Sequence, residues 1–399
     1  MSIVTHLPAL QVVLPLMAAP LTVLLRRRTL AYAVALLVSW LAFAIALALL
    51  WRVNHEGLIS YAIGSWAAPW GIEYRVDILS AFMLVLVSGM AALVLPYSRA
   101  SIEAEVPREQ HYLFYTMFLL CLTGLLGICI TGDAFNVFVF LEISSLSTYV
   151  LIALGRDRRA LLAAYQYLIM GSIGATFIVI GVGLLYLMTG TLNLADMGQR
   201  IAAVQGTRPV LAALAFLTVG ISLKLALFPL HQWLPNAYTY APSAVAAFLA
   251  ATATKVAVYV LLRFYFSVFG QSAVFASLPM QEVMLVLALT GMFAASTIAV
   301  MQTAISQFAP IEQHQKRLER AVEVARELHD TLAKRSEMAK LTGALGRYET
   351  PERIKIIDPP TDPTGPVTPG RFLFMLGSLI GGIIMGCGLA TLLEFADPA

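Results

Sequence analysis

Long apolar segments of about 20 residues alternate with short polar connections along most of the chain. A segment of this length crosses the hydrocarbon core of a bilayer as an α-helix, so the pattern predicts about ten transmembrane helices. The expected spans are Pro8–Leu25, Leu30–Trp51, Ile78–Pro96, His111–Ile130, Ala134–Leu154, Leu161–Met188, Val210–Leu230, Ala241–Phe266, Glu282–Met301 and Arg371–Leu393. The predicted fold class is therefore an all-α polytopic membrane protein.

Composition agrees with this interpretation. Hydrophobic residues make up 59% of the chain and charged residues 12%, against about 25% charged in soluble domains. The basic residues are spread over loops, so we expect no nucleic-acid partner. Cys121, Cys129 and Cys387 lie in predicted spans without CxxC spacing and are interpreted as core residues. No metal-ligand spacing or phosphate-binding loop is found, so we expect no metal, no cofactor and no catalytic residue.

The basic residues between the spans are unevenly distributed. Nineteen fall in connections on one side of the predicted membrane and five on the other. The positive-inside rule places the richer side in the cytoplasm of a bacterial-type cell with an inner membrane, and both termini on the opposite side. The richer set comprises Arg26, Arg27, Arg28, Arg99, Arg108, Arg156, Arg158, Arg159 and the basic residues from Lys316 to Arg371.

The stretch from Gly220 to Val256 contains two apolar segments separated by several prolines. Proline removes a backbone donor and clashes with the preceding turn, so Pro229 is expected to break the seventh helix. Freed backbone groups are tolerated inside a membrane only where protein or water covers them. The break therefore indicates a site buried inside the bundle.

Three charged residues lie within apolar segments: Glu142 in the fifth, Lys224 in the seventh and Lys255 in the eighth. Each costs roughly 2.5–3.5 kcal/mol at the centre of a membrane helix on insertion scales, so such residues are rarely without function. We interpret the three as a pathway for protons or cations. The alternatives are a Glu142 held by a neighbouring helix and lysines that extend to the membrane surface.

Hydroxyl groups accompany two of these charges. Ser145 and Tyr149 follow Glu142 at i+3 and i+7 on one helical face, where they can hold water near the carboxylate. Thr252 and Tyr259 are expected on the face of Lys255. His231 follows the break, and its imidazole can exchange a proton near neutral pH or simply face solvent.

Two further polar residues receive structural interpretations. Asp133 is expected to cap the fifth span by accepting hydrogen bonds from free backbone N–H groups. Arg263, near the outer end of the eighth span, is expected to extend its guanidinium to the membrane surface.

The segment Gln302–Gly370 differs in composition from the rest. Residues 311–341 alternate in charge and carry apolar residues at helical spacing, which predicts a cytoplasmic amphipathic helix. A Pro-rich connector leads to the last span, expected to be a membrane anchor. Its spacings Gly377-xxx-Gly381 and Gly382-xxx-Gly386 would also allow close helix contact.

Three stretches carry a resemblance to a known family: TGDAFNVFVFLEISSLSTYVLIALG, LMTGTLNLADM and LKLALFPLHQWLPNAYTYAPSAVAAFLAATATKV. They resemble the antiporter-like membrane subunits of Mrp-type cation/proton antiporters, the D subunit above all, and of respiratory complex I. In that family a glutamate on the fifth helix pairs with a lysine on the broken seventh, and a lysine on the eighth continues the proton path. The resemblance gives these roles to Glu142, Lys224 and Lys255, and a relay role to His231.

The resemblance extends over about residues 7–301 and stops near Gln302, so the family's second inverted five-helix repeat is not matched. We expect five parts: an N-terminal membrane segment (1–110), one antiporter half-channel module (111–266), a ninth span (267–301), the cytoplasmic segment (302–370) and the terminal helix (371–399).

The favoured hypothesis is a membrane subunit of a multisubunit Na⁺ or K⁺/proton antiporter, surrounded by lipid and by other membrane subunits. One alternative is a proton-pumping subunit of an NADH:quinone oxidoreductase-like complex, which alone would make the protein part of a translocase enzyme. The other alternative is a shortened, inactive scaffold subunit.

Overall fold

The computed structural model describes residues 3–270, 272–280, 282–294 and 323. Contacts divide the chain into two units, Met1–Phe308 and Ala309–Ala399, and the fold described here is that of the first. The predicted amphipathic helix, the Pro-rich connector, the last span and the end of the ninth span lie outside the described residues.

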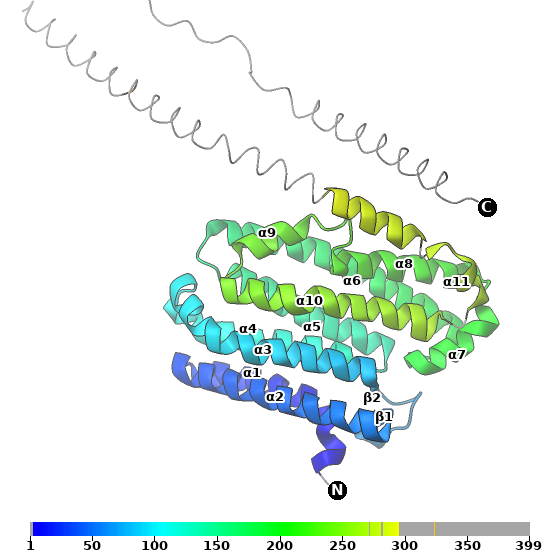
Figure 1. The fold of residues 1–399 in the computed structure, drawn as a ribbon, viewed down its shortest axis with the longest axis horizontal. Coiled ribbons are helices and arrows are strands. Elements are labelled where there is room, and N and C mark those ends of the chain that lie inside the picture. The colour runs from blue at the N-terminus through cyan, green and yellow to red at the C-terminus, as the bar shows by residue number, and fades with distance from the viewer. Residues whose placement is uncertain (1–2, 271, 281, 295–322, 324–399) are drawn as a thin grey trace, which may run out of the picture. The chain divides into compact units, whose positions relative to one another are not determined.

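Among the described residues, eight helices are long and apolar enough to cross a membrane. They are α1 (Leu7–Leu25), α2 (Arg28–Glu56), α3 (Ile78–Glu105), α4 (His111–Ile130), α5 (Ala134–Ala153), α6 (Arg158–Thr189), α8 (Arg208–Leu225) and α10 (Ser243–Leu262). The first eight predicted spans are thus confirmed. The described part of the ninth is a shorter apolar helix, Glu282–Ala294. In Figure 1 the long helices lie side by side, with their ends at two opposite edges of the bundle.

Shorter elements connect the spans. They are η1 (Ile3–His6), β1 (Ile59–Ala62), η2 (Ile63–Ser65), β2 (Glu73–Val76), η3 (Arg108–Gln110), α7 (Leu194–Val204), α9 (Trp233–Tyr240), the π-helical turn η4 (Arg263–Val268) and α11 (Ala273–Ser277). The strands β1 and β2 pair antiparallel, with Ile59 opposite Val76. The sequence pattern predicted only a polar connection here and did not predict the hairpin.

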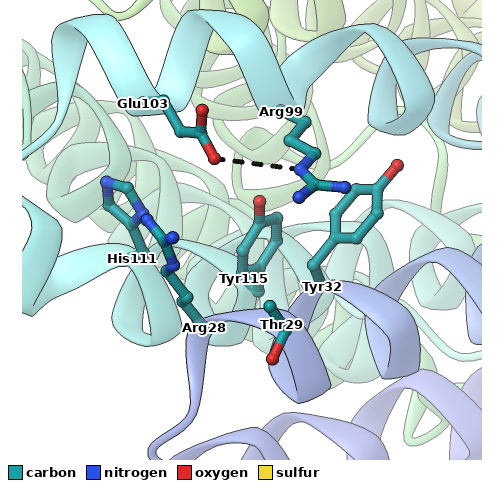
Figure 2. A pocket seen from close by; sticks show the side chains of 7 residues that line it. All are labelled: Arg28, Thr29, Tyr32, Arg99, Glu103, His111 and Tyr115. Atoms are coloured by element: carbon teal, nitrogen blue, oxygen red, sulfur yellow. Dashed lines mark ion pairs between the residues drawn. The ribbon is translucent and has the colours of Figure 1, made fainter.

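Backbone and side-chain contacts gather the basic connections at one end of the bundle. The Arg156 N–H donates to the Glu105 carbonyl oxygen at 3.1 Å, and the Ser243 hydroxyl donates to the Glu105 carboxylate at 2.7 Å. These bonds join the end of α3 to the α5–α6 connection and to the start of α10. The turn from α1 to α2, with Arg26–Arg28, lies at the same end as Arg99 (Figures 1 and 2). We call this the arginine-rich end.

The opposite end is tied together around the hairpin. Glu73 on β2 is buried, and its carboxylate accepts hydrogen bonds from the Ser60 hydroxyl at 2.5 Å and the Asn193 amide at 2.8 Å. The Glu73 carbonyl oxygen accepts from the Gly132 N–H at 2.8 Å. The hairpin therefore holds the α4–α5 turn and the connection before α7 in one polar network.

An ion pair joins α3 to α10 at this end. The Asp77 carboxylate caps α3 by accepting from the Ser80 N–H at 2.8 Å, and it also accepts two bonds from Arg263, at 2.5 and 2.6 Å. Burial alone would raise the pKa of Asp77, but the bonds from Arg263 and Ser80 outweigh it and hold that pKa below its ordinary value. The expectation that Arg263 extends to the membrane surface is wrong, because a carboxylate within reach satisfies its guanidinium inside the fold.

Small residues let neighbouring helices approach closely. A side chain at Gly220 on α8 would meet the Gly174 carbonyl oxygen of α6 at 2.7 Å, and one at Gly124 on α4 would meet the Ser144 backbone nitrogen of α5 at 2.5 Å. Membrane helices associate through such backbone proximity, since lipid provides no hydrophobic drive between them. These glycines therefore hold α8 closely against α6 and α5 closely against α4.

We predict that Asp77→Ala destabilises the protein by about 2 kcal/mol, because it removes a helix cap and two charge-assisted hydrogen bonds. Thermal unfolding of the purified protein measures the loss. The depressed pKa makes the stabilisation present above pH about 4 and lost as pH falls through the lower folded-state value. The isosteric Asp77→Asn should abolish this acid dependence.

The control is Glu103→Gln, which removes an exposed ion pair on the same helix and should change stability by less than about 0.5 kcal/mol. An Asp77→Ala variant as stable as wild type would contradict the stabilising role of the ion pair between Asp77 and Arg263.

Candidate functional site

Helix α5 positions the acidic residue of the site. Its first turn is capped by Asp133, whose carboxylate accepts from the Asn136 N–H at 2.7 Å, so the capping interpretation is confirmed. Glu142 lies mid-helix, with 26% of its side chain exposed. Ser145 and Tyr149 are both buried. Glu142, Ser145 and Tyr149 are spaced i, i+3 and i+7, so they lie on one face of α5.

Helix α8 brings the basic residue to the same level and then ends. Lys224 is the penultimate residue of α8, and Ala226 takes the left-handed conformation with φ 59°. The predicted span to Leu230 is too long, because Pro229 cannot follow in the helix: its ring would clash with the carbonyl group four residues earlier, at Leu225. The helix break is thus observed just before Pro229.

The break leaves carbonyl groups without helical partners, and the chain supplies new ones. The Leu223 carbonyl oxygen accepts from the indole N–H of Trp233 on α9 at 3.0 Å. The ring of Trp233 stacks on Tyr167 of α6, with centroids 4.0 Å apart and planes 2° from parallel. The Ser222 carbonyl oxygen accepts from the Leu227 N–H at 3.0 Å. Specific hydrogen bonds therefore hold the end of α8 in place, and the helix does not fray there.

At the break, the structure brings together three of the predicted residues. The Lys224 ammonium lies 3.3 Å from the Glu142 Oε1 and donates to the Ser145 hydroxyl at 2.7 Å. The Lys224 side chain is 5% exposed. An ammonium this deeply buried is tolerable only when a nearby charge and hydrogen bonds replace its lost hydration. Glu142 and Ser145 provide both from one helix.

A small cavity adjoins the Lys224 ammonium. Its volume is about 20 Å³, enough for roughly one water molecule. Its polar lining comes from Ser144, Ser145 and Thr148 of α5 and from Tyr167 of α6, and α10 contributes Ala253, Val256 and Ala257. The site is thus a charged pair beside a hydroxyl-lined, water-sized space.

Sequence reasoning missed Ser144, Thr148, Tyr167 and Trp233 in this arrangement. Ser144 and Thr148 are spaced i and i+4 on α5, which is a signal that the pattern did contain. Tyr167 and Trp233 carried no such signal, because only the fold brings α6 and α9 together.

Lys255 is not part of this cluster. It lies on an exposed face of α10, where its ammonium donates to the Ala250 carbonyl oxygen at 2.5 Å. At 3.6 residues per turn, this face is opposite the one that lines the cavity. Thr252 donates instead to the Phe248 carbonyl oxygen. Tyr259 donates to the Cys129 carbonyl oxygen and accepts from Arg263. The structure therefore brings neither hydroxyl to Lys255.

Two other candidates, Tyr149 and His231, each have a side-chain polar atom without a partner among the described residues. Within the described part of the chain, the buried Tyr149 hydroxyl and the His231 Nδ1 have no hydrogen-bond partner. The Tyr149 hydroxyl occupies the space left by Gly171, which a Cβ at that position would fill. The His231 ring packs against Phe228. Neither polar atom is thus satisfied by a described residue.

The described residues hold no group of three or more His, Cys, Asp or Glu that could bind a metal ion.

The model of the family described as NADH:quinone oxidoreductase/Mrp antiporter, TM, matches residues 131–308. This segment is similar to the transmembrane domain of that family. It contains Glu142, Lys224 and Lys255. A second family model, described as "G-rich domain on putative tyrosine kinase", matches residues 310–395. The boundary between the two matches falls where the sequence changes from apolar spans to the charged segment.

Individual relatives give the same assignment. The chain is 44% identical over 310 residues to the N subunit of the NADH-quinone oxidoreductase of Desulforudis audaxviator, covering 74% of this chain and 59% of that protein. It is 32% identical over 218 residues to the D subunit of the Na(+)/H(+) antiporter of Alkalihalophilus pseudofirmus, covering 55% of this chain and 44% of that protein. The chain thus spans about half the length of the relatives it matches.

Two solved complexes contain chains of similar fold. The membrane-bound sulfane sulfur reductase, an archaeal respiratory membrane complex, matches with a TM-score of 0.64 and 29% identity, covering 68% of this chain and 55% of that chain. The Mrp complex from Dietzia sp. matches with a TM-score of 0.61 and 28% identity, covering 68% and 50%. The expected resemblance to antiporter-like membrane subunits is confirmed.

We predict that Glu142→Gln lowers stability by about 2–3 kcal/mol, because it leaves the Lys224 ammonium buried without an opposite charge. Adding Lys224→Met should recover most of this loss, so the two changes are strongly non-additive in thermal unfolding. The exposed pair Asp196 and Arg200 serves as control, with a coupling below about 1 kcal/mol. Simple addition of the Glu142 and Lys224 effects would show that the pair does not interact.

Proposed function

We propose that this chain is a membrane subunit of a multisubunit monovalent cation/proton antiporter, and that protons pass through Glu142 and Lys224 toward Lys255. The observation that carries the proposal is the ion pair between Glu142 and Lys224 at a broken helix beside a water-sized cavity. A structural bundle gains nothing from such a pair that apolar side chains could not supply.

The geometry offers a simple way to move a proton. While the Glu142 carboxylate stays near Lys224, their attraction favours the charged ammonium. When the two separate, burial of Lys224 favours release of its proton to a neighbouring acceptor. A water molecule in the cavity, with the Ser145 and Tyr167 hydroxyls, would be that acceptor. The unpartnered groups of Tyr149 and His231 would serve as further relays.

Lys255 supports a multisubunit assembly. Its ammonium lies on an exposed face of α10, in a helix long and apolar enough to span the membrane. An ammonium facing lipid tails costs several kcal/mol. We therefore propose that another membrane subunit, or a further part of this chain, covers this face and provides a hydrated contact for Lys255. Na⁺ or K⁺ would be the coupled ion.

The proposed setting is a bacterial-type inner membrane with the arginine-rich end toward the cytoplasm, as the positive-inside rule requires. In this orientation both termini lie on the non-cytoplasmic side. Within the chain, residues 111–266 would act as the half-channel module, and residues 302–399 would attach or anchor the subunit.

A second candidate function is a proton-pumping subunit of an NADH:quinone oxidoreductase-like complex. The 44% identity to an N subunit of such an enzyme is the observation that favours it. The buried pair would do the same work in both settings, and only the companion subunits would differ. The third candidate is a scaffold role, in which the assembly would transport ions without the charged residues of this chain.

Reconstitution into vesicles with an imposed pH gradient tests the transport proposal. Together with its companion subunits, the wild-type protein should dissipate the gradient on addition of Na⁺ or K⁺. Lys224→Ala and Lys255→Ala should each abolish this response, because each removes one titratable group from a series pathway. Arg200→Gln changes a surface residue at the end of the bundle opposite the arginine-rich end. This variant should leave the response to Na⁺ or K⁺ intact.

The same vesicles separate the alternatives. A gradient that forms only when NADH and quinone are supplied would identify the pumping complex. Full antiport by an assembly that contains the Lys224→Ala variant would reduce this chain to a scaffold and overturn the proposal.

A further inference from the structure

A polar pocket lies at the arginine-rich end, where α2, α3 and α4 meet (Figure 2). Its volume is about 80 Å³, several times the space that one water molecule needs. It is lined by Arg28 and Thr29 at the start of α2, Tyr32 one turn later, Arg99 and Glu103 near the end of α3, and His111 and Tyr115 in α4. None of these residues belongs to the proton site described above.

The charges of the pocket are unbalanced in favour of an anion. Two guanidinium groups face it, from Arg28 and Arg99, against the single carboxylate of Glu103. Arg28 forms no ion pair within the described residues. Arg99 lies 3.8 Å from Glu103, and both side chains are largely exposed, so this pair is loose. The Arg99 guanidinium is placed by the Tyr32 ring, 5.7 Å from its centroid.

Two buried polar side chains reach the pocket from α4. Tyr115 is 3% exposed, and its hydroxyl points into the pocket between Arg99 and Glu103 (Figure 2) without a hydrogen-bond partner among the described residues. His111 is 2% exposed, and its Nε2 lies 3.1 Å from the Val106 carbonyl oxygen. That bond fixes the imidazole at the pocket wall. The Tyr115 hydroxyl is therefore placed to donate a hydrogen bond to a ligand held in the pocket.

The start of α2 adds to the positive potential. Its N-cap residue, Arg27, makes no side-chain cap hydrogen bond. The first backbone N–H groups of a long helix are then free, and the helix dipole favours an anion there. Thr29, in this first turn, lines the pocket and can donate its hydroxyl. Guanidinium groups, a hydroxyl and free N–H groups are the donors that bind a phosphate.

We propose that this pocket binds the phosphate of an anionic phospholipid. The pocket lies at the end of three helices that are long and apolar enough to span a membrane, which would place it near the lipid headgroups. The membrane-spanning helices α1 and α3 also carry exposed apolar side chains: Leu24 is 80% exposed and Leu93 65%. Acyl chains can lie against these side chains while the phosphate sits between Arg28 and Arg99. Basic pockets between membrane helices on the cytoplasmic side bind anionic headgroups in this manner.

Lipid retention by the purified full-length protein tests the proposal. Native mass spectrometry after exposure to phosphatidylglycerol, or to phosphatidylcholine with the same acyl chains, counts the lipids that stay bound. Wild type should retain phosphatidylglycerol preferentially. Arg28→Gln and Arg99→Gln should each lower that retention about tenfold. This factor corresponds to the free energy of one charge-assisted hydrogen bond. Glu103→Gln should raise it, because it removes the competing carboxylate.

Arg27→Gln is the matched control, since it removes the same charge from the same turn outside the pocket lining. An equal loss in Arg27→Gln and Arg28→Gln would show diffuse surface attraction and overturn the proposal. Equal retention of the two lipids would also overturn it. Displacement of phosphatidylglycerol by millimolar inorganic phosphate would make free phosphate the ligand. If an arginine variant folds poorly in thermal unfolding, unchanged retention in Glu103→Gln still contradicts the site.

Discussion

The burial of one ammonium group, that of Lys224, is the constraint on which the arrangement of this bundle depends. Its side chain is 5% exposed, and the nearest opposite charge is Glu142 at 3.3 Å on α5. Charge attraction inside a protein repays the loss of hydration only when the geometry is close and further hydrogen bonds are made. The Ser145 hydroxyl makes such a bond. The close packing of α6 against α8 at Gly174 and Gly220 keeps the backbone that carries Lys224 in place.

The same region has to satisfy the backbone of an interrupted helix. The chain does so with Trp233, which donates to the Leu223 carbonyl oxygen and is itself fixed by stacking on Tyr167. The residue that ends α8, the aromatic ring that covers the freed carbonyl and the helix that supports this ring are therefore interdependent. A bundle built only to anchor a protein in lipid needs none of these features, and this is why the site is interpreted as a place where charge moves.

Much of this could be predicted from the sequence. Apolar length located the eight described spans, and the cost of buried charge singled out Glu142 and Lys224 before their contact was visible. The remainder depends on tertiary partners. The end of α8 at Leu225 follows from Pro229 but was placed five residues too late. Lys255 was grouped with Glu142 and Lys224 as one pathway, yet the rotation of α10 turns its side chain outward. Arg263 was assigned to the surface because its acceptor, Asp77, is 186 residues away in the sequence.

The central claim is that Glu142 and Lys224 form a direct ion pair within the membrane. Solid-state NMR of the protein in lipid bilayers, with ¹⁵N in lysine side chains and ¹³C in glutamate carboxylates, measures their separation. The account predicts strong dipolar coupling that assigns to this pair, as an Nζ–Oε1 distance of 3.3 Å requires, and its loss in Lys224→Met. A separation beyond about 6 Å, the range over which an opposite charge stabilises a buried ion, would contradict it.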